Sequence, residues 1–394
     1  MKYDFDTVIN RKNMGSVKWD AIEKELGPGS DDILALSVAD MEFKVAPEIT
    51  GAIKKKADLA VYGYTGPTDS YFAAVIGWMQ RRHHWNIKKE WISPSAGVVP
   101  ALFSAIRAFT HSGDKVIIQS PVYYPFGRAV IQNGCQIVHN NLLYEDGRYT
   151  MDFDDLETKL QDPRVRVLIL CSPHNPISRV WTEEELLRLG ELCLEHRVLV
   201  ISDEIHADFV YKPHQHTVFA SLSPEFQDNS MTLTAPSKTF NLAGLQCSNI
   251  IIPNPKLKAQ FDIASQNVGF SSLNHFAYVA CEAAYREGEA WLNELLGHLE
   301  KNKNLVQSFM AENLPQIKVV ETEGTYLLWL DCRSLKLNDH ELERLMKEKG
   351  RIFLDEGYLF GPEGSGFERL NIACPRSVLV KALTNMKRAI DSIS

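Results

Sequence analysis

Short apolar runs alternate with helical patterns from about residue 91 to residue 253 of the chain. Several of these runs are apolar on consecutive positions, which is typical of strands that are buried on both faces of a sheet. They are residues 91–94, 115–120 (KVIIQS), 165–170 (VRVLIL), 198–204 (VLVISDE), 231–235 (MTLTA) and 248–253 (SNIIIP). One helix is predicted over residues 98–109, where apolar residues recur every three or four positions. Another is predicted over residues 182–196, where Thr182 and Glu185 have the spacing of a capping box.

This alternation predicts an α/β fold of three layers, in which helices cover both faces of a mostly parallel sheet. After about residue 285 the pattern changes to a long charged helix followed by strand-like residues 325–332 (TYLLWLDC) and 369–374 (RLNIAC). We therefore predict a large domain over residues 48–284. A smaller α+β domain is predicted from residues 1–47 together with residues 285–394.

Composition and charge narrow the class of protein. The chain has 394 residues, 45% of them hydrophobic, and a net charge of −8 with its Lys and Arg residues dispersed, which argues against nucleic acid or an anionic membrane as partner. No apolar run approaches the roughly 20 residues of a membrane span, and the first residues lack the apolar core of a secretory signal. We expect a soluble, cytoplasmic protein.

Cysteine and histidine residues do not form a metal-binding pattern. The seven cysteines are scattered and include no CxxC pair, so they are expected to be small core residues. The histidine motifs at residues 83–84 and 214–216 have no further ligands at helical spacing. They are expected in loops or at the surface, and no metal is predicted.

Polar and aromatic residues concentrate directly after the predicted strands, where ligands bind in parallel sheets. The segments are residues 95–99 (SAGVV), 120–125 (SPVYYP), 172–176 (SPHNP), 203–206 (DEIH) and 236–238 (PSK). Because these strand ends share one edge of the sheet, we expect them to surround one cavity.

Three of these segments have both a chemical and an ordinary interpretation. Gly97 begins a helix, whose free backbone N–H groups suit a phosphate, although glycine there is commonly only a cap. Tyr123 and Tyr124 could stack on a flat ring or simply pack in the core. Asn175 could hydrogen-bond a ring oxygen or form a turn before Pro176.

Asp203 and Lys238 are the more unusual residues. Asp203 ends a buried strand with no basic neighbour, so it requires a cationic partner such as a protonated ring nitrogen. Lys238 lies in TAPSKTFNLAGLQ with no acid nearby, which for a single lysine commonly means a solvated loop. Taken together, the ring stacker, the acid, the phosphate cradle and the unpaired lysine predict pyridoxal 5′-phosphate (PLP) bound covalently to Lys238.

Eight segments along nearly the whole chain resemble the fold-type-I PLP enzymes of the class I/II aminotransferase superfamily, and within it the branch of cystathionine β-lyases and cysteine C–S lyases. They are SVADMEF (37–43), YGYTGPTDSY (62–71), AGVVPA (96–101), SPVYYPF (120–126), CSPHNP (171–176), SDEIHADF (202–209), APSKTFNLAG (235–244) and RLNIACPRS (369–377). The resemblance implies the PLP transferase-like fold for the large domain.

The resemblance also implies roles for individual residues. Lys238 would hold PLP as a Schiff base and move protons at the substrate, and Tyr123 would stack on the ring and assist proton transfer. The other cofactor contacts would be Asp203 at the ring nitrogen, Asn175 at the ring oxygen, His206 beside the ring, and Gly97, Val98, Ser237 and Tyr64 at the phosphate. Tyr64 would come from the second subunit of a homodimer. The substrate would contact Arg369, which clamps its α-carboxylate, and also Tyr124 and Asp40.

Three positions depart from the pattern of typical aminotransferases. Gln246 stands where they have a phosphate-binding arginine, which favours a lyase because the lyase branch also tends to lack it. His206 stands where many have tyrosine, which leaves its link to the ring hydroxyl open. Ser178 replaces the glycine of the usual NPxG segment, and if its φ is positive, serine costs about 1 kcal/mol there.

The function implied is α,β-elimination on sulfur-containing L-amino acids such as L-cysteine and L-cystathionine, giving pyruvate, ammonia and sulfide or a thiol. The enzyme would be a carbon–sulfur lyase. An aminotransferase of the same fold is one alternative, and a PLP-holding regulatory protein is another. Substrate preference would depend on the cavity entrance, to which VADMEF and residues 350–366 are expected to contribute.

Overall fold

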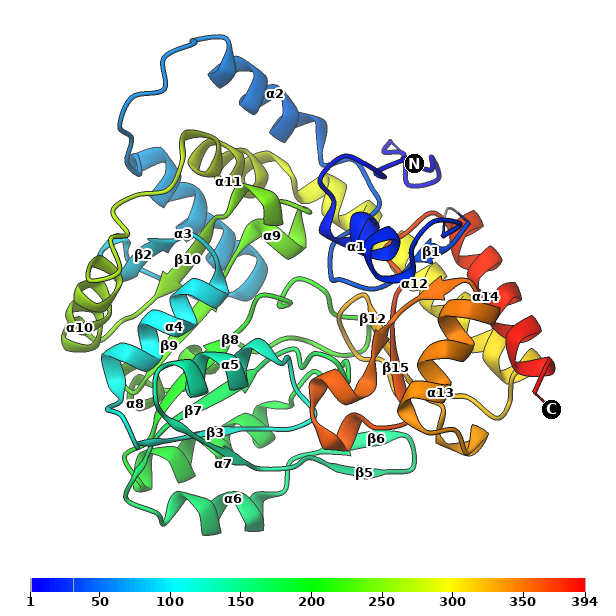
Figure 1. Cartoon of the computed structure of the whole chain (residues 1–394). Coiled ribbons are helices and arrows are strands. Elements are labelled where there is room, and N and C mark those ends of the chain that lie inside the picture. The colour runs from blue at the N-terminus through cyan, green and yellow to red at the C-terminus, as the bar shows by residue number, and fades with distance from the viewer. Residues whose placement is uncertain (1, 31, 394) are drawn as a thin grey trace.

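The computed structural model describes residues 2–30 and 32–393. Its centre is a seven-stranded sheet in the order β2-β10-β9-β8-β7-β3-β4 (Figure 1). All strands run parallel except β10, which is antiparallel to both neighbours. The strands are β2 (Ile92–Ser95), β3 (Lys115–Ile118), β4 (Gln136–His139), β7 (Val165–Cys171), β8 (Leu199–Asp203), β9 (Ser230–Thr234) and β10 (Ser248–Ile251). The predicted mostly parallel sheet is confirmed.

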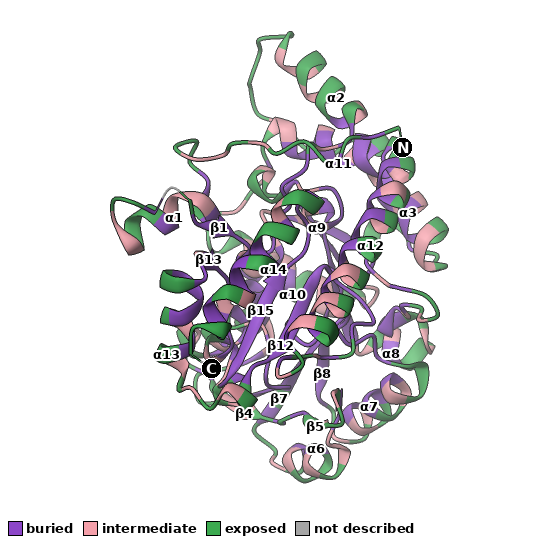
Figure 2. Ribbon diagram, turned by 90° about the vertical axis from the view of Figure 1, so that its right-hand side faces the viewer, coloured by how far each residue is buried: buried purple, intermediate pink, exposed green. Residues whose placement is uncertain are grey.

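Helices cover both faces of this sheet because its central strands are apolar on both sides. In β7, Val167 and Ile169 pack into one core cluster, while Leu168 and Leu170 pack into another. The first face carries α4 (Val98–Phe109), α5 (Pro125–Gln132) and α10 (Pro255–Gln266). The second face carries α6 (Phe153–Leu160), α7 (Glu183–Glu195) and α8 (Pro224–Asp228). Figure 2 shows the buried strands between helices whose outer faces are exposed.

Several further elements complete this part of the chain. Helix α11 packs against α2 and α3 at the β2–β10 end of the molecule (Figure 1). A short antiparallel hairpin of β5 and β6 follows β4. The bounds are α2 (Pro47–Ala57), α3 (Asp69–His83), α9 (Pro236–Thr239), α11 (His275–Glu287), β5 (Leu143–Glu145) and β6 (Arg148–Thr150). The predicted capping box of α7 is present, with Thr182 accepting from the Glu185 backbone and the Glu185 side chain accepting from the Thr182 backbone.

The remaining segments form a second, antiparallel sheet in the order β11-β12-β15-β14, packed with the long helix α12. The N-terminal strand β1 pairs in parallel with β13, so the first and last parts of the chain lie side by side (Figure 1). The elements are α1 (Val17–Leu26), β1 (Leu34–Ala35), α12 (Glu289–Asn313), β11 (Lys318–Val319), β12 (Leu327–Asp331), α13 (Asp339–Arg344), β13 (Ile352–Phe353), β14 (Asp355–Glu356), β15 (Phe367–Asn371) and α14 (Arg376–Asp391).

The pairing of β1 with β13 supports grouping residues 1–47 with residues 285–394, and the domain division itself stays a prediction. All seven cysteines are buried and unpaired, as expected. Within residues 2–30 and 32–393, no helix has both the length and the apolar character that crossing a membrane requires.

Candidate functional site

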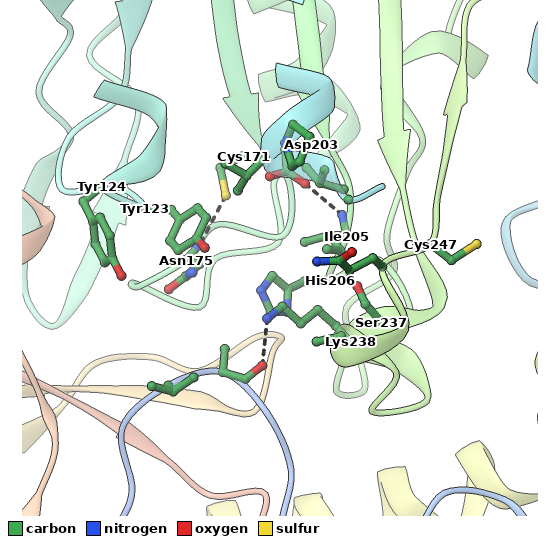
Figure 3. A pocket seen from close by; sticks show the side chains of 18 of the residues that line it. Tyr123, Tyr124, Cys171, Asn175, Asp203, Ile205, His206, Ser237, Lys238 and Cys247 are labelled. Carbon is green, nitrogen blue, oxygen red and sulfur yellow. Dashed lines mark hydrogen bonds between the residues drawn. The ribbon is translucent and has the colours of Figure 1, made fainter. Parts of the chain in front are cut away.

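A cavity of about 240 Å³ lies where β7, β8 and β9 end. Ten of the twelve residues expected at the site line it, from both the sheet and the C-terminal part of the chain (Figure 3). These ten are Gly97, Val98, Tyr123, Tyr124, Asn175, Asp203, His206, Ser237, Lys238 and Arg369. The structure therefore brings together segments that are far apart in the sequence, because parallel strands place their C-terminal ends at one edge.

Lys238 lies in the short helix α9, directly after β9. Its Nζ donates a hydrogen bond of 2.8 Å to the carbonyl oxygen of Ala39, and no acid of the described residues lies within ion-pair distance of it (Figure 3). That acceptor comes from a distant loop that no local pattern reveals. Burial, together with the nearby charge of Arg369, lowers the pKa of Lys238 to about 8. About a tenth of the amine is therefore neutral at pH 7, far more than at the ordinary lysine pKa, and the neutral form is the one that a nucleophile or proton acceptor requires.

Asp203 is the last residue of β8 and is only 4% exposed. The backbone N–H of Ile205 donates to its Oδ1 at 3.2 Å. Burial raises the pKa of Asp203 to about 7, against the smaller lowering effect of that N–H group and of Lys238. In the described part of the chain, no cationic side chain lies within ion-pair distance of this carboxylate. The site thus contains a buried acid that a cationic ligand atom would ionise.

Gly97 and Val98 form the start of α4 at the cavity wall. Gly97 has a φ of +141°, which disfavours other residues, and a Cβ there would lie 3.3 Å from Pro100 Cδ. The conformation presents the first backbone N–H groups of a twelve-residue helix to the cavity. Ser237 and Gln246 also line it. This combination suits an anionic group such as a phosphate.

Arg369 approaches the cavity from β15 and is buried. Its Nη1 donates to Asn175 Oδ1 at 2.9 Å, and its Nη2 pairs with Asp355. The guanidinium carbon lies 4.8 Å from the ring centroid of Phe360. Its Nε is buried and has no hydrogen-bond partner among residues 2–30 and 32–393. A buried donor without an acceptor is costly, and a carboxylate ligand would satisfy it.

Tyr123 and Tyr124 lie side by side on the cavity wall, with ring centroids 5.4 Å apart (Figure 3). The backbone N–H of Tyr123 donates to the Asn175 carbonyl at 3.1 Å, which ties two predicted site segments together. Burial, with the adjacent Tyr124, raises the pKa of Tyr123 to about 12. Its phenol therefore carries its proton at neutral pH and could donate it.

His206 also lines the cavity, where burial and the positive charge of Lys238 hold its pKa well below the ordinary value. The imidazole is therefore neutral, and its Nδ1 is buried with no hydrogen-bond partner in the part of the chain that the structure describes. Ser178 has a φ of +61°, the condition under which serine was expected to be strained. Its hydroxyl compensates by donating to the Leu327 carbonyl, and it lies 3.2 Å from Thr325 Oγ1.

Two predicted site residues are not brought into the cavity. Asp40 pairs instead with Arg11 at 2.7 Å and Lys18 at 3.1 Å, and its neighbours Val38 and Ala39 line the cavity in its place. Tyr64 has a fully exposed side chain. That exposure leaves it available to a second subunit, and its role stays a prediction.

Sequence reasoning did not identify Asp355, Cys171 and Ile205, which also line the cavity. Asp355 faces Arg369 directly across the β14–β15 pair, so its place depends on strand register. The only sequence signal for Asp355 was that it lies within residues 350–366, which were expected to contribute to the cavity entrance. Ile205 precedes the predicted site residue His206, and Cys171 precedes the predicted segment 172–176, but apolar residues at strand ends are ordinary core positions.

Known proteins resemble this chain over almost its full length. Residues 31–385 match the family model of aminotransferase class I and II. Cystathionine beta-lyase PatB of Bacillus subtilis (strain 168) is 48% identical over 98% of this chain and 100% of its own. The crystal structure of cystalysin from Treponema denticola, which contains PLP, is 44% identical with a TM-score of 0.98 over 100% of both chains. A PLP-bound C–S lyase from Staphylococcus hominis is 31% identical with a TM-score of 0.92, covering 99% of this chain and 98% of its own.

Proposed function

Since the chain belongs to the class I and II aminotransferase family, we propose that it is a carbon–sulfur lyase that uses PLP to eliminate sulfur from L-amino acids such as L-cysteine and L-cystathionine. The family is PLP-dependent, and the relatives described above include a cystathionine beta-lyase and a C–S lyase. The observation that carries the proposal is the position of Lys238, Asp203 and Arg369 around one cavity.

The residues present fit PLP. Asp203 is a buried acid that lacks a cationic partner among the described side chains, which suits a protonated ring nitrogen. The N-terminus of α4 at Gly97 suits the phosphate, and Tyr123 can stack on the ring. Asn175 and His206 would contact the ring, Val98 and Ser237 would help to hold the phosphate, and Lys238 would hold the cofactor covalently.

When bound, PLP supplies the electron sink that makes the Cα proton of an amino acid removable. Arg369 would bind the substrate α-carboxylate and so fix the orientation of the Cα–H bond. Its unpartnered Nε supports this role. The Lys238 amine, whose pKa is about 8, would then accept the Cα proton. Tyr123 keeps its proton at neutral pH and could donate it to the departing sulfur. With L-cysteine and one water, the products would be pyruvate, ammonia and hydrogen sulfide.

We also propose that the enzyme is a homodimer in which Tyr64 contacts the phosphate of the other subunit. Leu59, Val61, Tyr62 and Tyr64 are all exposed in the single chain. Such a run of exposed apolar side chains is typical of an interaction surface. A cytoplasmic location is proposed because all seven cysteines are free, as in a reducing compartment.

The test is to incubate the purified, PLP-loaded protein with L-cysteine or L-cystathionine and no keto acid. Pyruvate and ammonia should appear in equal amounts, with sulfide from cysteine, and Lys238→Ala should abolish both products and the covalent fixing of the cofactor to the protein by borohydride. Turnover that requires an added keto acid would instead identify an aminotransferase. Cofactor binding without either reaction would favour the regulatory alternative.

A further inference from the structure

The histidine motifs at residues 83–84 and 214–216 were expected in loops or at the surface, and this expectation is wrong for His83, which ends α3 with a buried side chain. His216 lies in a loop, as expected, but its side chain is buried as well. The side chains of His83 and His216 are 6% and 3% exposed. Their rings pack perpendicular to each other with centroids 5.7 Å apart. His83 ends α3 and His216 lies in the segment after β8, so tertiary packing rather than sequence proximity joins them. His84, by contrast, is exposed.

Each of these histidines pairs with a buried acid from the segment that follows β8. His216 Nε2 lies 2.9 Å from Glu204 Oε2, and His83 Nε2 lies 3.1 Å from Asp208 Oδ1. Although burial alone would raise the pKa of Asp208, its contacts with His83 and Thr239 hold it below the ordinary value. Neither acid faces the cavity.

The two ends of this series of contacts, Thr239 and Glu204, are sequence neighbours of Lys238 and Asp203. Thr239 Oγ1 donates to Asp208 Oδ2 at 2.7 Å, and Thr239 directly follows Lys238. Glu204 directly follows Asp203 and also accepts from Ser202 Oγ at 2.8 Å and from the Phe219 backbone at 3.1 Å. Two sets of buried polar contacts, joined in the middle by the packing of the His83 ring against the His216 ring, therefore connect the short helix that carries Lys238 to the strand end that carries Asp203.

We propose that these five residues form a positioning bridge that fixes the Lys238 amine relative to the Asp203 carboxylate; the bridge consists of Thr239, Asp208, His83, His216 and Glu204. The proposal rests on the roles proposed above for Lys238 and Asp203. None of the five touches the cavity, so they act through their neighbours and are not catalytic residues. A network that served only to fill the core would affect unfolding without affecting the cofactor.

Thr239→Val is the sharpest test because it removes one donor and keeps the shape of the side chain. The matched control is Thr232→Val in β9, since Thr232 is also fully buried but its Oγ1 has no hydrogen-bond partner. Thr239→Ser restores the donor. In the PLP-loaded enzyme we expect Thr239→Val to lower kcat for L-cysteine and to speed cofactor release, each by about tenfold, because a hydrogen bond to a charged group is lost. KM should change less than about twofold, since Arg369 is untouched.

The pH midpoint of the visible absorption band should also shift in Thr239→Val, and Thr239→Ser should recover most of each property. His83→Asn provides a second variant, with the exposed neighbour change His84→Asn as its control. If the bridge acts as a unit, the double variant Thr239→Val, His83→Asn should lose less than the product of the two single losses.

The proposal is overturned if Thr239→Val matches Thr232→Val in kcat, cofactor release and pH midpoint, or if it only lowers the midpoint of urea unfolding. It is also overturned if the two losses multiply independently. Lys238→Ala distinguishes failure of the proposed role of Lys238 from failure of the positioning bridge. If borohydride still links the cofactor covalently to the Lys238→Ala protein, the role of Lys238 fails whatever the Thr239 variants do. If that link is lost while Thr239→Val behaves like Thr232→Val, only the bridge fails.

Discussion

Asp203→Asn should have opposite effects on the cofactor-free and the cofactor-loaded protein. Burial raises the pKa of Asp203 from 3.8 to about 7. At about 1.36 kcal/mol per pKa unit, keeping this carboxylate ionised in the empty cavity costs about 4 kcal/mol of folding free energy. Asparagine has nearly the same shape, can still accept from the Ile205 backbone, and carries no charge. The variant without cofactor should therefore be more stable than the wild type at pH 8, by up to about 4 kcal/mol.

Whether stability rises or falls with pH depends on which state, folded or unfolded, binds the proton of Asp203 more tightly. Between about pH 4 and pH 7 the folded chain holds a proton on Asp203 that the unfolded chain has lost, so this group makes stability fall as the pH rises through that window. Below pH 4 both states are protonated and the variant should match the wild type. With PLP bound, the ionised carboxylate pairs with the protonated ring nitrogen, and asparagine cannot replace it. The loaded variant should therefore lose cofactor affinity and elimination activity.

The assay is urea unfolding of the cofactor-free and loaded proteins at pH 4.5 and pH 8, with the midpoint and slope fitted separately. The control is Asp146→Asn, at an exposed turn position with a φ of +47°, where asparagine is well accepted. The expected result is stabilisation of cofactor-free Asp203→Asn by up to about 4 kcal/mol at pH 8, falling to about 1 kcal/mol at pH 4.5. Equal stability of variant and wild type at pH 8, or equal stabilisation of the loaded protein, would refute the assignment of this acid.

Three further predictions test other parts of the site. Arg369→Lys should raise KM for L-cysteine by roughly 10- to 100-fold with a smaller change in kcat, because one ammonium cannot bind a carboxylate at two points; an unchanged KM in steady-state kinetics would contradict this. Ser178→Ala should lower the free energy of unfolding by about 2 kcal/mol, since it keeps the positive φ and loses the hydrogen bond to Leu327, whereas Ser178→Gly should stay within about 1 kcal/mol. Tyr64→Ala mixed with Lys238→Ala should regain about a quarter of wild-type activity through mixed dimers, and no recovery would refute a shared site.

The core of the large sheet could be predicted because its signals are local. Consecutive apolar residues mark strands buried on both faces, and α4 covers the predicted residues 98–109. The edge strand β4 (Gln136–His139) gave no such signal, because it is partly exposed and has only two apolar residues, with a polar residue on either side. The reversed direction of β10 could not be predicted either, since an apolar run looks the same whichever way the strand runs.

Some features of the site could likewise be predicted from local sequence signals, and others could not. Its strand-end residues could be predicted because one rule places all such ends at a single edge of the sheet. The Ala39 acceptor of Lys238 and the cross-strand partner of Arg369 could not, because each depends on a register or a loop distant in the sequence. The burial of His83 and His216 was missed for a further reason. Histidine is commonly exposed, and the partner that makes its burial favourable lies in another element.

The ionisation of Lys238 and Asp203 explains why such a cavity is useful only with a ligand. Burial lowers the pKa of the amine and raises that of the acid, so both groups are held toward their neutral forms, which is unfavourable near neutral pH. A ligand that takes up the amine covalently and offers a cationic atom to the acid relieves both costs together. This requires the two groups to stand at a fixed separation that matches the ligand. The pairing of β8 with β9 already sets the distance between the two strand ends, and the buried contacts from Thr239 to Glu204 add a second connection through side chains.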